Sequence, residues 1–156
     1  MANFDMKITL FPFFRMKIKF VLAVFVWALM VFGQHSFAQE MIDGVYHISS
    51  VEDLKSFTER VNNGENTANA ILTCDLDLDN KPHTPIGSNE SPYMGHFDGG
   101  THSISNIIIY NTSLSQLGFF GTIGGGCVIE NLIIASGRIQ GNKACAGLVG
   151  ACRGNA

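Results

Sequence analysis

The first clear pattern in the chain is an apolar stripe at helical spacing soon after residue 50. Apolar side chains recur every three or four positions and charged ones lie between them, which is typical of an amphipathic α-helix. The stripe consists of Val51, Leu54, Phe57 and Val61. Ser49 and Glu52 have capping-box spacing at its start, and Asn62 to Gly64 tolerate the conformation that ends a helix. We predict a short strand, Gly44 to Ile48, followed by this helix, within residues 39–66.

Beyond the helix the hydrophobic period changes from three or four to two. Ala70, Leu72, Cys74, Leu76 and Leu78 alternate with mostly polar residues. This alternation predicts a strand with one buried and one solvated face. A loop rich in Pro, Asn, Ser and Gly follows, over residues 80–95.

From Gly95 onward, short β-branched runs alternate with glycines, and two sets of positions repeat. Ile104, Asn106 and Ile109 recur at Ile129, Asn131 and Ile134, each 25 residues later. A glycine motif recurs after 29 residues: Gly118, Phe119, Phe120 and Gly121 correspond to Gly147, Leu148, Val149 and Gly150. A repeat of this length, built from strands and glycine turns, indicates stacked β-coils in a solenoid.

The repeated residues have structural interpretations. Glycine supplies positive φ at sharp corners, and β-branched residues suit strands. Asn106 and Asn131 would stack their amides from one coil to the next. The amphipathic helix would cap the N-terminal end of the stack, whose unpaired backbone otherwise invites aggregation. No such cap follows at the C-terminal end, so we expect possible self-association there.

In these features the chain resembles bacterial surface proteins with GLUG motifs, which also occur in IgA-specific metalloendopeptidases. The resemblance runs from Tyr46 to Gly150, and its parts are Tyr46 to Ile48, Asp53, Leu54 and Phe57, Leu72 to Leu78, Pro85 to Gly87, Gly95 to Gly99, His102 to Ile104, and Gly147 to Gly150. It implies an all-β fold, a right-handed parallel β-helix with one N-terminal capping α-helix. It also implies export, frequent exposure at the cell surface, and adhesion or carbohydrate contact.

Two features depart from the pattern of this family. The chain stops within a repeat, after Gly150, which predicts that residues 67–156 are GLUG-type repeats truncated at the C-terminus. The zinc motif His-Glu-x-x-His of the metalloendopeptidases does not occur in the sequence.

The N-terminus has the pattern of a secretory signal peptide. Lys7, Arg15, Lys17 and Lys19 precede an apolar run over residues 20–32, and small residues Ser36 and Ala38 follow. We predict a signal peptide over residues 1–38, with cleavage before Gln39 and no membrane span afterwards. Met16 is an alternative start, and an uncleaved membrane anchor is an alternative to cleavage. Export leaves the cell surface, the extracellular space and the periplasm open.

Charge and cysteine content limit the partners. After cleavage the chain holds six Lys and Arg against twelve Asp and Glu, a net charge of about −6, which argues against nucleic acid. Cys74, Cys127, Cys145 and Cys152 remain. They could form disulfides in an oxidising compartment or serve as small buried hydrophobic residues; their spacing does not decide between the two.

Candidate chemistry is sparse. After Asp98 the only acid is Glu130, so the repeats cannot assemble a two-carboxylate glycosidase. Asp98 and His102 could pair as a base and its orienting group, but a turn at Asp98 is favoured. Residues 75–80 resemble a calcium loop that lacks its glycine and its final glutamate, and the histidines lack zinc-ligand spacing. We expect no catalytic residue, metal or cofactor.

The sequence therefore predicts a non-catalytic, adhesin-like module that binds glycans or host and matrix proteins. Tyr93 and Tyr110 are candidate exposed stacking residues, each of which could instead anchor a loop, and Asp98 and His102 are further candidate ligand contacts. The alternative is the N-terminal part of a larger secreted enzyme, a metallopeptidase or a polysaccharide-degrading enzyme.

Overall fold

A computed structural model describes residues 41–113 and 116–154, which belong to one compact unit, Phe37–Ala156. The predicted signal peptide, both candidate start methionines and the cleavage position lie outside the described residues. Within them, no helix is long and apolar enough to cross a membrane.

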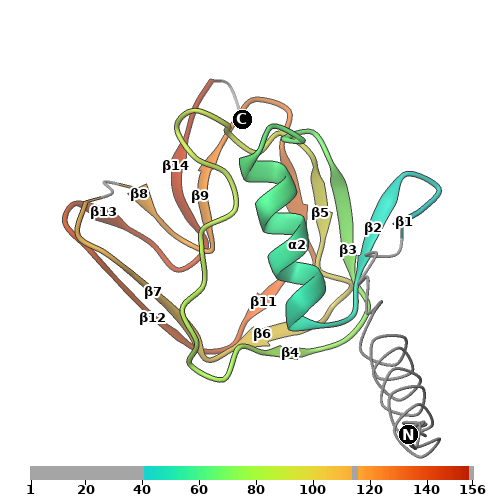
Figure 1. The fold of residues 1–156 in the computed structure, drawn as a ribbon, viewed down its shortest axis with the longest axis horizontal. Helices are drawn as coiled ribbons and strands as arrows, with labels where there is room; N and C mark the ends of the chain where they lie inside the picture. The colour runs from blue at the N-terminus through green and yellow to red at the C-terminus, as the bar shows by residue number, and fades with distance from the viewer. Residues whose placement is uncertain (1–40, 114–115, 155–156) are drawn as a thin grey trace, which may run out of the picture. The chain divides into compact units, whose positions relative to one another are not determined.

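The described residues form one helix and many short strands (Figure 1). Helix α2 covers Val51–Asn62. The N-terminal strands are β1 (Met41–Ile42), β2 (Val45–Ile48), β3 (Asn69–Leu72) and β4 (Leu76–Asp77). The next five are β5 (His96–Asp98), β6 (Ser103–Ser105), β7 (Ile107–Asn111), β8 (Gln116–Leu117) and β9 (Phe120–Ile123). The last five are β10 (Val128–Glu130), β11 (Ile133–Ile134), β12 (Gly137–Gly141), β13 (Ala144–Cys145) and β14 (Val149–Cys152).

The predicted right-handed parallel β-helix is wrong. The strands of the described part divide into separate small sheets and do not close into a solenoid. One sheet is five-stranded, in the order β1-β2-β3-β5-β10, one is three-stranded, β11-β6-β4, and three are two-stranded, β12-β7, β13-β8 and β14-β9. The five-stranded sheet is mixed, because β1 pairs antiparallel with β2. Residues in left-handed conformation, such as Thr101, Asn106 and Asn131, interrupt the strands and separate the sheets.

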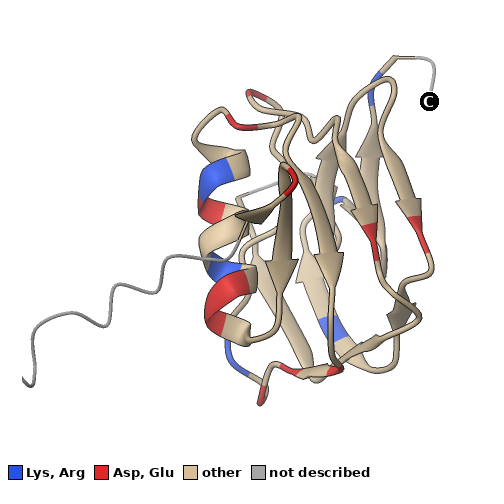
Figure 2. Cartoon of the chain, turned by 90° about the vertical axis from the view of Figure 1, so that its right-hand side faces the viewer, with Lys and Arg blue, Asp and Glu red and all other residues tan. Residues whose placement is uncertain are grey.

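Helix α2 begins one residue later than the capping-box spacing predicts. Ser50, not Ser49, is the N-cap, and its hydroxyl accepts from the Asp53 backbone N–H at 3.1 Å. The Asp53 carboxylate in turn accepts from the backbone N–H of Ser49. The predicted stripe does face the core, since Leu54, Phe57 and Val61 are buried. The helix is thus part of the core, and Figure 2 shows it lying along one side of the strands with its charged positions outward.

The predicted alternation after the helix is confirmed for burial but not for a continuous strand. Leu72, Leu76 and Leu78 are buried, while Asp75 and Asp77 are exposed. The run splits into β3 and β4. The Cys74 thiol lies at the break and donates to the Ser49 carbonyl at 3.1 Å.

Each of the strands β5 to β9 pairs parallel with the corresponding one of β10 to β14. The residues that face each other in these pairs show whether the 25- and 29-residue offsets of the sequence are strand registers. The 29-residue offset is confirmed, because Phe120 pairs with Val149. The 25-residue offset is wrong as a strand register: Ile104 pairs with Ile134, while Ile129 pairs with Phe97.

The predicted asparagine ladder is therefore also wrong. Asn106 and Asn131 share a left-handed conformation, with φ of 56° and 53°, but they occupy different corners. Each amide donates to an aspartate on the earlier strand that pairs with the strand just before the asparagine. Asn106 donates to Asp77 of β4 at 2.8 Å, and Asn131 donates to Asp98 of β5 at 3.0 Å. The same local turn is used twice, and each use is held by a carboxylate.

Three of the four glycines of the repeated motif serve close packing, and none of the four serves positive φ. None of Gly118, Gly121, Gly147 and Gly150 has positive φ. A Cβ on Gly118 would lie 2.7 Å from the Gly150 nitrogen, and one on Gly121 would lie 2.5 Å from the Gly87 oxygen. Gly118, Gly121 and Gly150 require glycine because neighbouring backbones leave no room for a side chain, whereas Gly147 has open space around it.

The layer β10–β14 is an open end of the core. Inward residues of the preceding layer, such as Phe97, Ile104 and Phe120, are fully buried. Their partners Ile129, Ile134 and Val149 are only half-buried, because no further strand among residues 41–113 and 116–154 covers them. Each of β10 to β14 lies at the edge of its sheet.

The two repeat glycines Gly147 and Gly150 provide a matched test of the packing. A Cβ on Gly150 would meet the Leu117 nitrogen at 2.7 Å, whereas one on Gly147 meets nothing within 4 Å. We expect Gly150→Ala to destabilise the protein by roughly 2 kcal/mol, as overpacking does, and Gly147→Ala to change stability by less than about 0.5 kcal/mol. Urea unfolding followed by circular dichroism measures both, and equal effects would contradict this account.

The open layer predicts association between two copies. Val128 and Ile133 are exposed apolar residues on it, at 46% and 51% exposure. Unpaired strand edges add strands readily, and charge on an edge prevents this. Light scattering after size exclusion should show mass rising with concentration, and the double variant Val128→Lys/Ile133→Lys should remain monomeric. Met41→Lys, a charge on the opposite edge strand β1, is the control and should behave as wild type; a monomeric wild type at all concentrations would exclude the association.

Candidate functional site

The two tyrosines predicted as exposed stacking residues have opposite environments. Tyr93 is fully buried; its hydroxyl donates to the Ala68 carbonyl at 2.9 Å and its ring stacks on Phe120 at 5.6 Å. Burial raises the pKa of Tyr93 well above its ordinary value. The expectation that Tyr93 is exposed is wrong, because its ring fills the core beside Phe57. Tyr110 is 65% exposed on β7 and remains a candidate contact.

Asp98 holds a turn. Its Oδ1 accepts from the Gly100 backbone N–H at 2.9 Å and from the Asn131 amide at 3.0 Å, and these hydrogen bonds, the backbone one first, lower the pKa of Asp98. Both bonds favour the ionised carboxylate. They fix the corner between β5 and β6.

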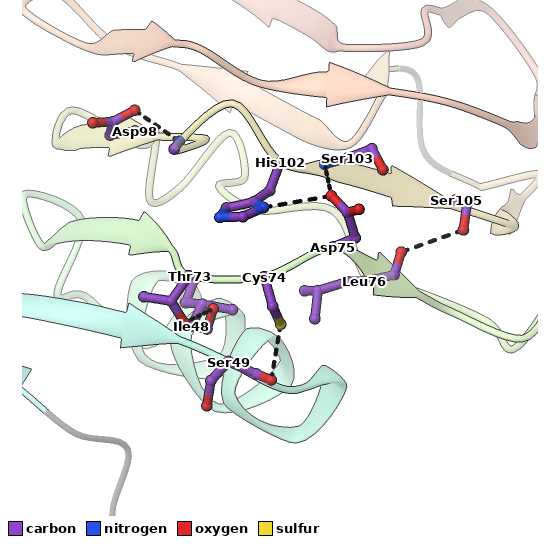
Figure 3. Close-up of polar contacts among 11 residues, drawn as sticks. Ile48, Ser49, Thr73, Cys74, Asp75, Leu76, Asp98, His102, Ser103 and Ser105 are labelled. Carbon is purple, nitrogen blue, oxygen red and sulfur yellow. Dashed lines mark hydrogen bonds and ion pairs between the residues drawn. The ribbon is translucent and has the colours of Figure 1, made fainter.

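The structure does not bring Asp98 and His102 together as a base and its orienting group. His102 donates its backbone N–H to the Gly99 carbonyl at 2.8 Å, and its Nδ1 lies 3.5 Å from Oδ1 of Asp75 (Figure 3). Asp75 comes from the break between β3 and β4, and its Oδ1 also accepts from the Ser103 backbone N–H at 2.7 Å. That backbone hydrogen bond is the main cause of the lowered pKa of Asp75. The pair thus fastens one strand layer to the next.

A hollow lies on the outer face of β7 and β12. It has a volume of about 300 Å³ and is lined by Ile108, Ile109, Tyr110, Arg138 and Gln140. Strand alternation places Ile108 and Tyr110 outward, while Ile107 and Ile109 are buried. Parallel register sets Arg138 beside Ile108 and Gln140 beside Tyr110. An exposed ring therefore borders a cation and an amide on two adjacent strands.

Arg138 and Gln140 fix each other's side chains in this hollow. Nη2 of Arg138 donates to Oε1 of Gln140 at 3.3 Å. The remaining guanidinium donors and the Gln140 amide nitrogen are donor groups on an exposed surface. Neither residue was predicted from the sequence. The alternation of polar Arg138 and Gln140 with apolar Ile139 could have indicated that both side chains lie on the outer face of a strand, beside the strand that carries Tyr110.

A second hollow, of about 540 Å³, lies between α2 and the segment from Leu78 to Thr84. His83 lines it and stacks on Phe119, with ring centroids 5.1 Å apart. Its Nε2 is buried and has no hydrogen-bond partner among the described residues. Burial lowers the pKa of His83 to about 4. The neutral imidazole thus serves as a packing group.

The cysteines do not form disulfides in this structure, where all four are free. Burial, with a smaller effect of neighbouring Cys152, raises the pKa of Cys127 to about 11, which keeps its thiol protonated at neutral pH. Among residues 41–113 and 116–154, no group of three His, Cys, Asp or Glu side chains could hold a metal ion.

Comparisons with known proteins are limited. No family model matches the chain, so the resemblance to GLUG-motif proteins stays a prediction. One relative, described as a "Putative Gly-rich membrane protein" of Evansella cellulosilytica, is 36% identical over 84 residues, 54% of this chain. The chain spans about 10% of the length of that relative. No solved structure matches.

The buried His83 predicts acid-sensitive stability. Its folded pKa, about 4, lies below the ordinary value of 6.5, so the unfolded state binds a proton first as pH falls. The stabilisation is complete above about pH 6.5 and is lost progressively between pH 6.5 and pH 4. Between pH 7 and pH 5 this costs roughly 2 kcal/mol of unfolding free energy.

His83→Phe, which retains the stacking on Phe119, should remove that part of the pH dependence. Urea unfolding at pH 7 and pH 5 measures the difference between the wild type and the variant. Substitution of His47 by Gln is the control, because His47 makes no ion pair among the described residues, and it should leave the dependence as in the wild type. A His83→Phe variant with an unchanged slope would show that His83 is not the titrating group.

Proposed function

We propose that this chain is a non-catalytic binding module of an exported, envelope-associated protein, and that the hollow on β7 and β12 contacts a glycan. The observation that carries the proposal is the exposed Tyr110 ring beside Arg138 and Gln140. An aromatic ring with one open face receives the apolar C–H face of a sugar ring, while adjacent donors bind its hydroxyls. Predicted export and the description of the relative as a membrane protein support placement at the cell envelope.

The hollow is held in place by rigid elements, as a binding site requires. Strand β7 is fixed on both sides: β12 pairs with it over five residues, and Pro82 bridges to Ile108 on the other side. Its inward residues Ile107 and Ile109 are anchored in the core. The outward side chains of β7 are therefore presented on a backbone held from both sides, while Arg138 and Gln140 lie on the edge strand β12, which pairs with β7.

The hollow is also small and open. Its volume of about 300 Å³ suits one or two sugar rings rather than a buried ligand. Contact of this size gives weak single-site binding, which surface proteins strengthen by engaging several sites at once.

Substitution of Tyr110 tests the proposal. We expect a screen of the purified protein against immobilised glycans to identify a ligand, and Tyr110→Ser to weaken binding about tenfold through loss of the ring face. Tyr110→Phe keeps the ring and should bind within about twofold of wild type. Circular dichroism checks that both variants fold, as expected for a residue 65% exposed. Wild type that binds no glycan, or equal binding by all three proteins, would refute the proposal.

A further inference from the structure

We infer that the ligand of the β7–β12 hollow is an acidic saccharide, one whose ring carries a carboxylate; this inference rests on the proposed glycan function. The group that points to it is Arg138. Among the residues that the structure describes, no carboxylate lies within ion-pair distance of its guanidinium, and the hydrogen bond to Gln140 is to a neutral group. A guanidinium presents parallel N–H donors that match a carboxylate, and such charge-assisted pairs are stronger than neutral ones.

The surroundings of the hollow favour an anion. After Asp98 the sequence contains one acid, Glu130, and three bases, Arg138, Lys143 and Arg153. Glu130 is engaged on another sheet, where its Oε1 lies 2.9 Å from Nε2 of His96. On the other side of β7, next to the Pro82 bridge, Lys81 and Asp79 pair at 3.4 Å and neutralise each other.

The ring beside the cation distinguishes a sugar from other anions. Tyr110 lies diagonally across the strand pair from Arg138, since its direct partner is Gln140. A uronic acid ring could thus place its C–H face on Tyr110 and its carboxylate toward Arg138, with a ring hydroxyl at the Gln140 amide. A poly-glutamate peptide would use Arg138 but has no ring with a C–H face for the tyrosine.

The test compares uronate oligosaccharides with their own carboxyl-reduced forms. The panel contains galacturonate, mannuronate–guluronate and hyaluronan oligomers, so that linkage varies, and each reduced form has the same rings without the charge. Titration calorimetry at low and moderate salt should show at least one uronate binding about tenfold more tightly than its reduced counterpart, with a preference that falls as salt rises. A poly-glutamate peptide is the non-saccharide anion.

Arg138→Gln should abolish the preference, leaving the uronate and its reduced form equal. Lys55→Gln, the same charge change at an exposed position of α2, is the matched control and should keep the wild-type preference. Equal wild-type binding of acidic and reduced sugars overturns the inference but supports the glycan function. Poly-glutamate binding as tight as the best uronate, or a preference that survives Arg138→Gln, also overturns the inference. Binding of neither sugar form overturns the inference, whereas the glycan function is refuted only if the screen of immobilised glycans also finds no ligand.

Discussion

The aromatic contacts of Phe57 hold the two kinds of structure in this protein together. Its ring, on α2, lies 5.9 Å from Tyr46 on β2 and 6.0 Å from Tyr93 and from Phe97 on β5. Burying such a ring contributes roughly 2–3 kcal/mol, and edge-to-face geometry adds to it. Through Tyr93 the same cluster fixes the long loop before β5 and reaches Phe120 on β9. The strand layers are thus positioned from one helical residue outward.

The elements that depend on local pattern could be predicted, whereas those that depend on partners far along the chain could not. The apolar stripe of α2 and the alternation through Leu72 to Leu78 follow from side-chain period alone, and both have the predicted burial. Asn106 and Asn131 show the limit. Their identical turns made the surrounding segments look equivalent, but backbone pairing sets Ile134, not Ile129, beside Ile104. Turn residues specify a corner without specifying which strands meet beyond it.

The candidate site also combines residues that local pattern predicts with residues whose position depends on distant partners. Tyr93 lies in a segment rich in polar and turn-forming residues, and its burial depends on contact with the distant Phe57 ring. Arg138 and Gln140 lie beside Ile108 and Tyr110 because of the strand register, which no short motif encodes. His102 finds Asp75, a residue of an earlier layer, because the chain returns to it after a corner. Contacts between distant parts of the chain, rather than motifs along it, therefore place His102 beside Asp75 and Gln140 beside Tyr110.

The uneven distribution of charge has a physical consequence for the whole unit. Residues 41–98, which include β2 near one edge of the five-stranded sheet, hold ten acids and three bases. The last layer, whose strand β10 forms the other edge, follows with one acid and three bases up to residue 154. Such a separation gives the unit an electric dipole along the direction in which its layers succeed one another. Beside an anionic surface, such a dipole would turn the last strands toward that surface and the helix away from it.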